Sequence, residues 1–237
     1  LSSAVDGSLK RLKTDYIDLY QLHWPERITN TFGKRDFDSS FNDKWEDNFE
    51  NVLFNLKEII SSGKVRQIGI SNENPWAFMK YLELSKKKLP KTITIQNPYS
   101  LLNRLFEIGN SEICMREDVG LLAYSPLGFG VLSGKYLNGN MPKDSRLKLF
   151  PNLSRFSGEN SMKATSMYYN ISKKHDLSLT QMALSFVNSR PFVTSNIIGA
   201  TKLNQLKENI ESINIDLSED ALKDINEVHK IIPNPAP

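Results

Sequence analysis

The order of apolar and polar residues along the chain alternates between short strand-like stretches and longer helical ones. Residues 92–96 are rich in β-branched side chains, which favours a strand, and the apolar residues of 49–60 recur at helical spacing. On this basis five strands are predicted, at residues 16–22, 65–70, 92–96, 119–124 and 194–199. Helices are predicted at residues 3–12, 49–60, 74–86, 105–116, 159–174, 180–189, 202–212 and from 218 onward.

Residues typical of helix ends support these boundaries. Gly63 tolerates a left-handed turn and ends the helix at 49–60. Asn74 is a good N-cap residue, and Pro75 suits the first helical position. Residues 125–156 are rich in Gly, Pro, Ser and Asn, which predicts a long loop, and long loops in compact domains usually have a function. The helix at 202–212 carries one apolar face, made of Leu203, Leu206, Ile210 and Ile213.

Strands that alternate with helices predict a parallel α/β sheet. A doubly wound sheet would show a glycine-rich phosphate-binding motif at the start of an early helix, and the sequence has none. A (β/α)8 barrel needs eight strands. We therefore expect residues 1–237 to form a single barrel domain that is incomplete at its N-terminus, with about five of the eight strands present and three lying before Leu1.

Composition excludes several classes of protein. Apolar residues make up 39% of the 237 residues and charged residues 24%, which is ordinary for a globular protein. The net charge of +3 is small and the basic residues are scattered, so nucleic acid is not an expected partner. No apolar stretch approaches about 18 residues, which argues against membrane insertion. The single cysteine, Cys114, fits a reducing compartment, so a cytoplasmic location is expected.

Candidate chemistry lies at the ends of the predicted strands, where the functional residues of a (β/α)8 barrel gather. Each strand ends in polar residues, in the segments QLHWP (21–25), GISN (69–72), IQNPY (95–99), AYSPL (123–127) and IGAT (198–201). A barrel would bring these ends together around one rim. A metal hydrolase on this fold would need several histidines and carboxylates there, and His23 is the only histidine at a predicted strand end.

The combination of these motifs resembles the aldo-keto reductases along the whole chain. It is most similar to the NADP(H)-dependent branch that includes bacterial Tas-type reductases and the potassium-channel β subunits. Four stretches carry the resemblance: SLKRLKTDYIDLYQLHWP (8–25), GKVRQIGISN (63–72), YSPLGFGVLSGKY (124–136) and IGATKLNQLKENI (198–210).

The resemblance implies that the protein reduces aldehydes or ketones to alcohols by hydride transfer from NADPH, with His23 in the catalytic centre. In the family this histidine orients the carbonyl or relays a proton. An aspartate, a tyrosine and a lysine complete the family's catalytic group, the tyrosine donating the proton. No residue of this sequence matches those three, which belong to the first part of the family's barrel. The chain of 237 residues by itself is therefore expected to be inactive.

The resemblance also implies a cofactor site. Ser71, Asn72 and Gln96 would bind the nicotinamide carboxamide, because hydroxyl and amide groups complement its donors and acceptor. Tyr124 would stack on the nicotinamide ring. The loop that begins at residue 125 would fold over the pyrophosphate, with glycines that permit close approach of the backbone. The site residues implied in this loop are Ser125, Leu127, Lys135 and Arg146.

The adenosine end of the cofactor would lie at the helix that follows the last predicted strand. A helix N-terminus binds anions, and Thr201 is expected to open this helix. Many family members carry arginine where this chain has Gln205, and Lys202 is the candidate cation that compensates. The residues implied at this end are Gly199, Thr201, Gln205, Glu208 and Asn209.

Two other functions stay open from the sequence. The protein could be a nicotinamide-binding regulatory or sensor subunit with little turnover, or an inactive truncated fragment. The expected partner of an enzyme is a small-molecule carbonyl substrate, whose identity the sequence does not indicate. Residues 26–47 form a polar and aromatic loop that could cover the substrate opening, form a surface insertion or contact a partner.

Overall fold

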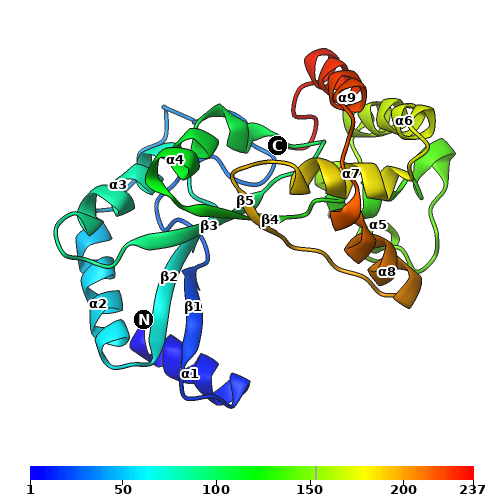
Figure 1. Cartoon of the computed structure of the whole chain (residues 1–237). Helices are drawn as coiled ribbons and strands as arrows, with labels where there is room; N and C mark the ends of the chain where they lie inside the picture. The colour runs from blue at the N-terminus through cyan, green and yellow to red at the C-terminus, as the bar shows by residue number, and fades with distance from the viewer. Residues whose placement is uncertain (153) are drawn as a thin grey trace. The chain divides into compact units, whose positions relative to one another are not determined.

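The computed structural model of the chain describes residues 1–152 and 154–237. Within these residues one five-stranded sheet has the order β1-β2-β3-β4-β5, and both the β1–β2 and the β2–β3 pairs are parallel. Sequence order and sheet order coincide, whereas a doubly wound sheet reverses direction at a switch point. The fold-class prediction is therefore confirmed: the sheet matches five consecutive strands of a (β/α)8 barrel. The strands are β1 Ile17–Leu22, β2 Val65–Ser71, β3 Thr92–Pro98, β4 Gly120–Tyr124 and β5 Val193–Asn196 (Figure 1).

Helices follow each strand of the described chain. The α-helices are α1 Ser2–Leu12, α2 Phe49–Ser61, α3 Pro75–Ser85, α4 Asn110–Glu117, α5 Arg146–Leu149, α6 Glu159–Lys174, α7 Leu179–Asn188, α8 Leu203–Glu211 and α9 Glu219–Ile231. Short 3₁₀ helices lie at Leu105–Ile108, Gly128–Ser133, Leu137–Gly139, Ser154–Phe156 and Ser212–Asn214. Among the described helices, none combines the length and the apolar character needed to span a bilayer.

Three sequence predictions need correction. The helix predicted at 105–116 is interrupted at Gly109, where an added Cβ would lie 2.9 Å from Pro75 Cγ, so the chain passes too close to Pro75 for a side chain. Within the predicted long loop, residues 125–152 and 154–156 include short helical turns, and positive φ angles at residues such as Gly130 (87°) keep these turns short. The strand predicted at 194–199 ends earlier, at Asn196, whose side-chain amide is drawn towards α7 by a bond of 2.9 Å to Asn188 Oδ1.

The described chain forms two compact units, and each is described by itself. The first unit comprises Leu1–Asn30, Asp36–Asn97 and Gly109–Leu121. The second comprises Thr31–Arg35, Pro98–Ile108 and Leu122–Pro237. The expectation that residues 1–237 form a single domain stays a prediction.

In the first unit α2 packs against both β2 and α3 (Figure 1). The apolar stripe of α2 predicted from the sequence is the face that packs, with Leu53 and Leu56 fully buried. Each such side chain stabilises the fold by roughly 1.5–3 kcal/mol relative to an exposed one. Phe49 lies edge-on to Tyr81 at 4.7 Å between ring centroids, which joins the start of α2 to α3.

In the second unit α7 is the central helix. A capping box between Ser178 and Gln181 fixes its first turn, and its apolar side chains from Leu179 to Val187 are buried. Phe186 stacks near Tyr99, with ring centroids 6.0 Å apart. This core holds the segment 98–108, which follows β3 in the chain.

The C-terminal tail also belongs to the second unit, where it binds the short segment Thr31–Arg35. Arg35 Nη2 donates to the carbonyl oxygens of Pro233 (2.8 Å) and Asn234 (2.7 Å). Gly33 N donates to the carbonyl of Pro237 at 2.8 Å. Part of the polar and aromatic loop after His23 is thus fixed by the last residues of the chain.

Candidate functional site

The predicted residues of the first unit meet at the carboxyl ends of β1, β2 and β3. Ser71 Oγ donates to the backbone carbonyl of Gln96 at 2.7 Å. Asn72 Nδ2 donates to the carbonyl of His23 at 2.8 Å and to Ser71 Oγ at 3.1 Å. Asn72 lies in the left-handed region, with φ of 59°, a conformation that asparagine tolerates better than most residues. The three strand ends are therefore tied together by the side chains of Ser71 and Asn72.

Polar groups in this cluster differ in their access to solvent. Ser71 is buried, Asn72 and Gln96 are half-buried, and His23 is exposed. The imidazole of His23 stacks on Trp24, with ring centroids 4.4 Å apart and an interplanar angle of 16°. Stacking restricts the ring orientation while its nitrogens stay accessible. The side chains of His23, Asn72 and Gln96 are thus at least partly open to solvent beside the buried hydroxyl of Ser71.

Tyr124 is the last residue of β4 and lies in the second unit. Its side chain forms a hydrogen bond with Arg155, and burial raises the pKa of the phenol, so Tyr124 stays protonated at neutral pH. Burial lowers the pKa of Arg155, against the opposing influence of Tyr124. The guanidinium lies over Phe32 at 5.8 Å and over Phe156 at 5.1 Å. Arg155 was not among the sequence-predicted residues, because nothing local to position 155 indicates that it faces a strand end.

The loop after Tyr124 forms a close turn around a cation. An alanine Cβ at Gly130 would lie 2.6 Å from Lys135 Nζ, so the ammonium group lies directly against this glycine. Ser125 and Leu127 form the preceding turn, their carbonyls accepting from the amides of Gly128 and Gly130 (both 2.9 Å). Gly130 has a positive φ of 87° and no side chain, so it leaves room for this contact.

Arg146 lies at the first position of α5, and its guanidinium is 4.4 Å from the centre of the Phe129 ring. Its side chain is exposed and free to meet an anion from solvent. In the same loop Lys135 lies 5.2 Å from the ring centre of Tyr136. Both predicted cations are thus placed by an aromatic ring of their own loop.

The predicted adenosine residues surround the start of α8, which begins at Leu203, two residues later than expected for Thr201. Gln205 Oε1 accepts from Thr201 N (3.2 Å) and from Thr201 Oγ1 (3.3 Å), so this glutamine closes the turn before the helix. Asn209 Nδ2 donates to the carbonyl of Gly199 at 3.4 Å. The carboxylate of Glu208 accepts from Ser178 Oγ at 2.5 Å. Lys202 is exposed at the N-cap position.

The structure thus groups the predicted residues in two sets. The first unit holds His23, Ser71, Asn72 and Gln96, which are joined by hydrogen bonds. The second unit holds the remaining predicted residues: Tyr124, Ser125, Leu127, Lys135, Arg146, Gly199, Thr201, Gln205, Glu208 and Asn209.

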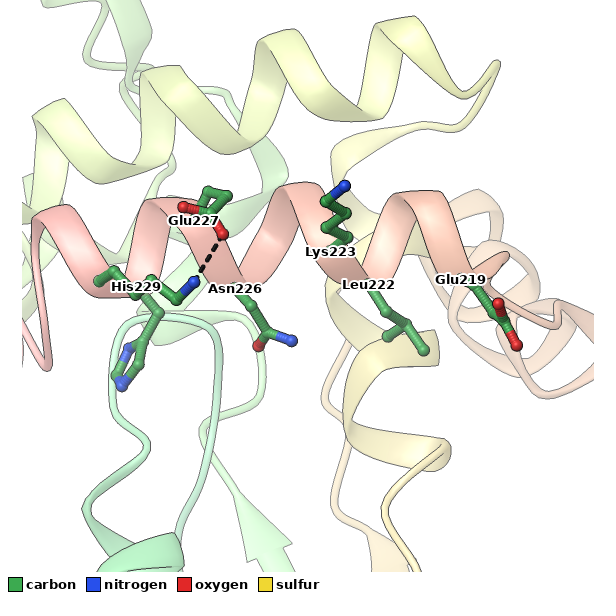
Figure 2. A pocket seen from close by; sticks show the side chains of 7 residues that line it. Glu219, Leu222, Lys223, Asn226, Glu227 and His229 are labelled. Carbon is green, nitrogen blue, oxygen red and sulfur yellow. Dashed lines mark hydrogen bonds and ion pairs between the residues drawn. The ribbon is translucent and has the colours of Figure 1, made fainter.

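A shallow hollow in the second unit, on α9, contains none of the predicted residues. Figure 2 shows Leu222, Asn226 and His229 on the same side of the helix. All of its lining residues belong to α9, so no second element contributes a side chain, and Lys230 Nζ is paired with Glu227 at 2.7 Å. In the described chain, no group of three or more His, Cys, Asp and Glu residues could hold a metal ion.

Comparison with known proteins places the chain in a family. The model of the aldo/keto reductase family matches residues 1–230. The chain is 50% identical to protein tas of Escherichia coli (strain K12), over all of this chain and 68% of that protein. It is 40% identical to an aldo-keto reductase of Babesia bovis, over 95% of this chain and 85% of that protein. It is 31% identical to L-glyceraldehyde 3-phosphate reductase of Escherichia coli (strain K12), over 90% of this chain and 58% of that protein. The chain belongs to the aldo/keto reductase family, whose members include oxidoreductases that act on carbonyl groups.

Proposed function

We propose that the protein is an NADP(H)-dependent oxidoreductase that reduces small aldehydes or ketones to alcohols, with His23 in the catalytic centre. The observation that carries the proposal is the hydrogen-bonded cluster at the ends of β1, β2 and β3. There Asn72 holds the backbone of His23 and the hydroxyl of Ser71 with the same amide group. A reacting carbonyl and a nicotinamide carboxamide need such groups side by side.

The donor set fits a nicotinamide dinucleotide. Ser71, Asn72 and Gln96 supply hydroxyl and amide groups for the carboxamide. The close turn at Gly130 with Lys135 against it suits a phosphate, since an added Cβ would fill the space beside the ammonium group. The nicotinamide, when bound, supplies the hydride.

The chain's own residues would bind, orient and handle the proton. The exposed imidazole of His23, fixed against Trp24, would donate a hydrogen bond to the carbonyl oxygen and so orient it. Tyr124, which its raised pKa keeps neutral, would present a flat uncharged ring to the nicotinamide. Lys135 and Arg146 would hold phosphate groups, with Thr201, Gln205, Glu208 and Asn209 at the adenosine end.

Preference for NADPH over NADH is part of the proposal. Lys135, Arg146 and Lys202 are the cations available to a 2′-phosphate, and each charge-assisted bond contributes roughly 1.5–3 kcal/mol. At least about tenfold tighter binding of NADPH is therefore expected. The 237-residue chain by itself is expected to show no turnover, because the Asp, Tyr and Lys implied by the resemblance have no match in it. A cytoplasmic location also stays a prediction.

The test uses the protein produced from its complete gene. Fluorescence titration should give at least tenfold tighter binding of NADPH than of NADH, and a panel of small aldehydes should be reduced. The variants Lys135→Met and Arg146→Met should weaken NADPH binding, whereas Lys143→Met, an exposed lysine of the same loop, should not. Equal affinities for the two cofactors would refute the NADPH preference. Cofactor binding without turnover of any carbonyl would favour the regulatory subunit.

A further inference from the structure

A buried ion pair lies immediately beside the strand-end cluster of the first unit. Glu73 follows Asn72 in the chain, and its carboxylate accepts from Arg27 Nη1 at 3.1 Å and from Nη2 at 2.7 Å. The Arg27 side chain is 9% exposed and the Glu73 side chain 4%, whereas the pair of Arg66 with Asp18 in the same unit is open to solvent. A bidentate pair of this kind has a fixed geometry as well as charge.

Aromatic rings enclose the arginine of this pair. The Arg27 guanidinium lies 5.3 Å from the centre of the Trp76 ring and 5.9 Å from that of Phe49. Trp76 belongs to the first turn of α3 and Phe49 to the first turn of α2. The starts of two helices therefore fix the position of the Arg27 guanidinium. Its two hydrogen bonds in turn fix the carboxylate of Glu73.

The backbone of Glu73 is also held by buried asparagines. Its carbonyl oxygen accepts from Asn97 Nδ2 at 2.9 Å and from Asn110 Nδ2 at 3.1 Å. Asn97 lies in β3 and Asn110 in α4, and both are buried. Side chain and main chain of Glu73 are thus fixed by three separate parts of the first unit: Arg27, β3 and α4.

Asn72 is the neighbour of this anchored residue in the chain, and its own N–H donates to the carbonyl of Gln96 at 3.0 Å. It lies between Ser71, the last residue of β2, and Glu73, and it adopts a left-handed φ of 59°. A non-glycine residue in this region is held there by its surroundings. With Ser71 fixed by the sheet and Glu73 by Arg27, the Asn72 amide is directed at the carbonyl of His23 and at Ser71 Oγ.

We propose that Glu73, held by Arg27, is a positioning residue that fixes the Ser71–Asn72 pair for the nicotinamide carboxamide. This inference rests on the proposed function, because the carboxamide is the ligand group in question. Burial of the pair has a penalty of several kcal/mol per ion that mutual attraction offsets only when the geometry is good. Two hydrophobic residues would fill the same space without this penalty. The pair instead fixes one backbone geometry at residue 72.

The experiment compares two ligands that share the adenosine end. NADPH carries the nicotinamide, and adenosine 2′,5′-bisphosphate lacks it. In the protein from its complete gene, Glu73→Gln should weaken NADPH binding about tenfold, as expected for the loss of one or two carboxamide hydrogen bonds. The affinity for the bisphosphate should stay within about twofold. The matched control Asp18→Asn, which breaks the exposed pair with Arg66, should change neither affinity.

Each outcome decides a separate point. An equal loss for both ligands, or no loss for either, overturns the positioning role, because a merely structural residue would not change the ratio of the two affinities. Failure of the wild-type protein to bind NADPH overturns the proposed function and this inference with it. If Glu73→Gln does not fold, Arg27→Lys keeps the charge and loses the paired geometry. It should shift the affinity ratio in the same direction by a smaller factor, and an unchanged ratio would again overturn the role.

Discussion

Gly69 in the middle of β2 is the position where a single added methyl group should do most damage in the first unit. An alanine Cβ there would lie 2.3 Å from Thr94 Oγ1 on β3 and 3.1 Å from both Cγ and Oε1 of Gln21 on β1. Ordinary van der Waals contact begins at 3.4 Å, so Thr94 or its strand must move by about 1 Å. β2 is paired on both sides, so its backbone cannot shift without disturbing a neighbour.

The expected magnitude follows from this geometry. Extra methyl groups forced into a packed interior destabilise proteins by about 1–3 kcal/mol. For a protein of 150–250 residues or more, 1 kcal/mol lowers the melting temperature by roughly 2–4 °C, so Gly69→Ala should lower it by about 2–12 °C. The clash lies two residues before Ser71, so cofactor affinity should fall as well.

Thermal melts and urea titrations of four proteins would measure the effect: wild type, Gly69→Ala, Thr94→Ala and the double variant. Thr94→Ala removes the oxygen that the new methyl group would meet, and by itself it should cost no more than about 1 kcal/mol. The double variant should recover a large part of the loss caused by Gly69→Ala. Strictly additive effects would refute the reasoning, because they would show that Thr94 Oγ1 is not the obstacle.

Two further outcomes are expected. In the protein from its complete gene, His23→Ala should lower carbonyl turnover on the order of 10²–10⁴-fold and leave NADPH affinity nearly unchanged, by steady-state kinetics and fluorescence titration; turnover within a few-fold of wild type would make His23 structural. Burial lowers the pKa of His229 below its usual 6.5, with a further contribution from Arg104. The unfolded chain therefore takes up the proton first, and the free energy of unfolding should fall as the pH drops below about 6.5. Urea titrations at pH 7 and 5 should show a smaller drop for His229→Gln, and an equal drop would contradict the assignment.

Most strand positions and helix starts could be predicted because their causes are local. Ser218 was predicted to start the last helix, and its hydroxyl does accept from Ala221 N at 3.2 Å. Asn74 lies at the predicted N-cap of α3 but makes no side-chain cap bond there. Its amide instead donates to Thr29 Oγ1 at 2.6 Å, in a loop 45 residues earlier in the chain. A capping residue could thus be recognised from its neighbours, whereas its partner could not.

The candidate site shows the same division. His23, Ser71, Asn72 and Gln96 could be found because each stands at the end of a strand. The residues that hold them do not stand at strand ends, so the sequence gives no comparable signal for them. Arg27 and Glu73 lie 46 positions apart, and a single Arg and a single Glu in polar segments are typical of exposed surface. Arg155 lies 31 positions after its partner Tyr124, in a segment without periodicity. Such pairs form only when the folded chain brings the two distant segments together, so the local sequence does not predict them.

The helix α8 shows why periodicity and burial are separate properties. The spacing of Leu203, Leu206 and Ile210 in α8, and of Ile213 in the 3₁₀ helix that follows, predicts one apolar face, and in the described chain all four side chains are exposed. The residue of α8 that is buried is Asn209, a polar one, because its amide reaches the carbonyl of Gly199. Periodicity defines a face of a helix, whereas burial requires a second element against that face. In α7 the apolar side chains meet the rest of the second unit and are buried, so the same pattern gives a core in one helix and a surface in the other.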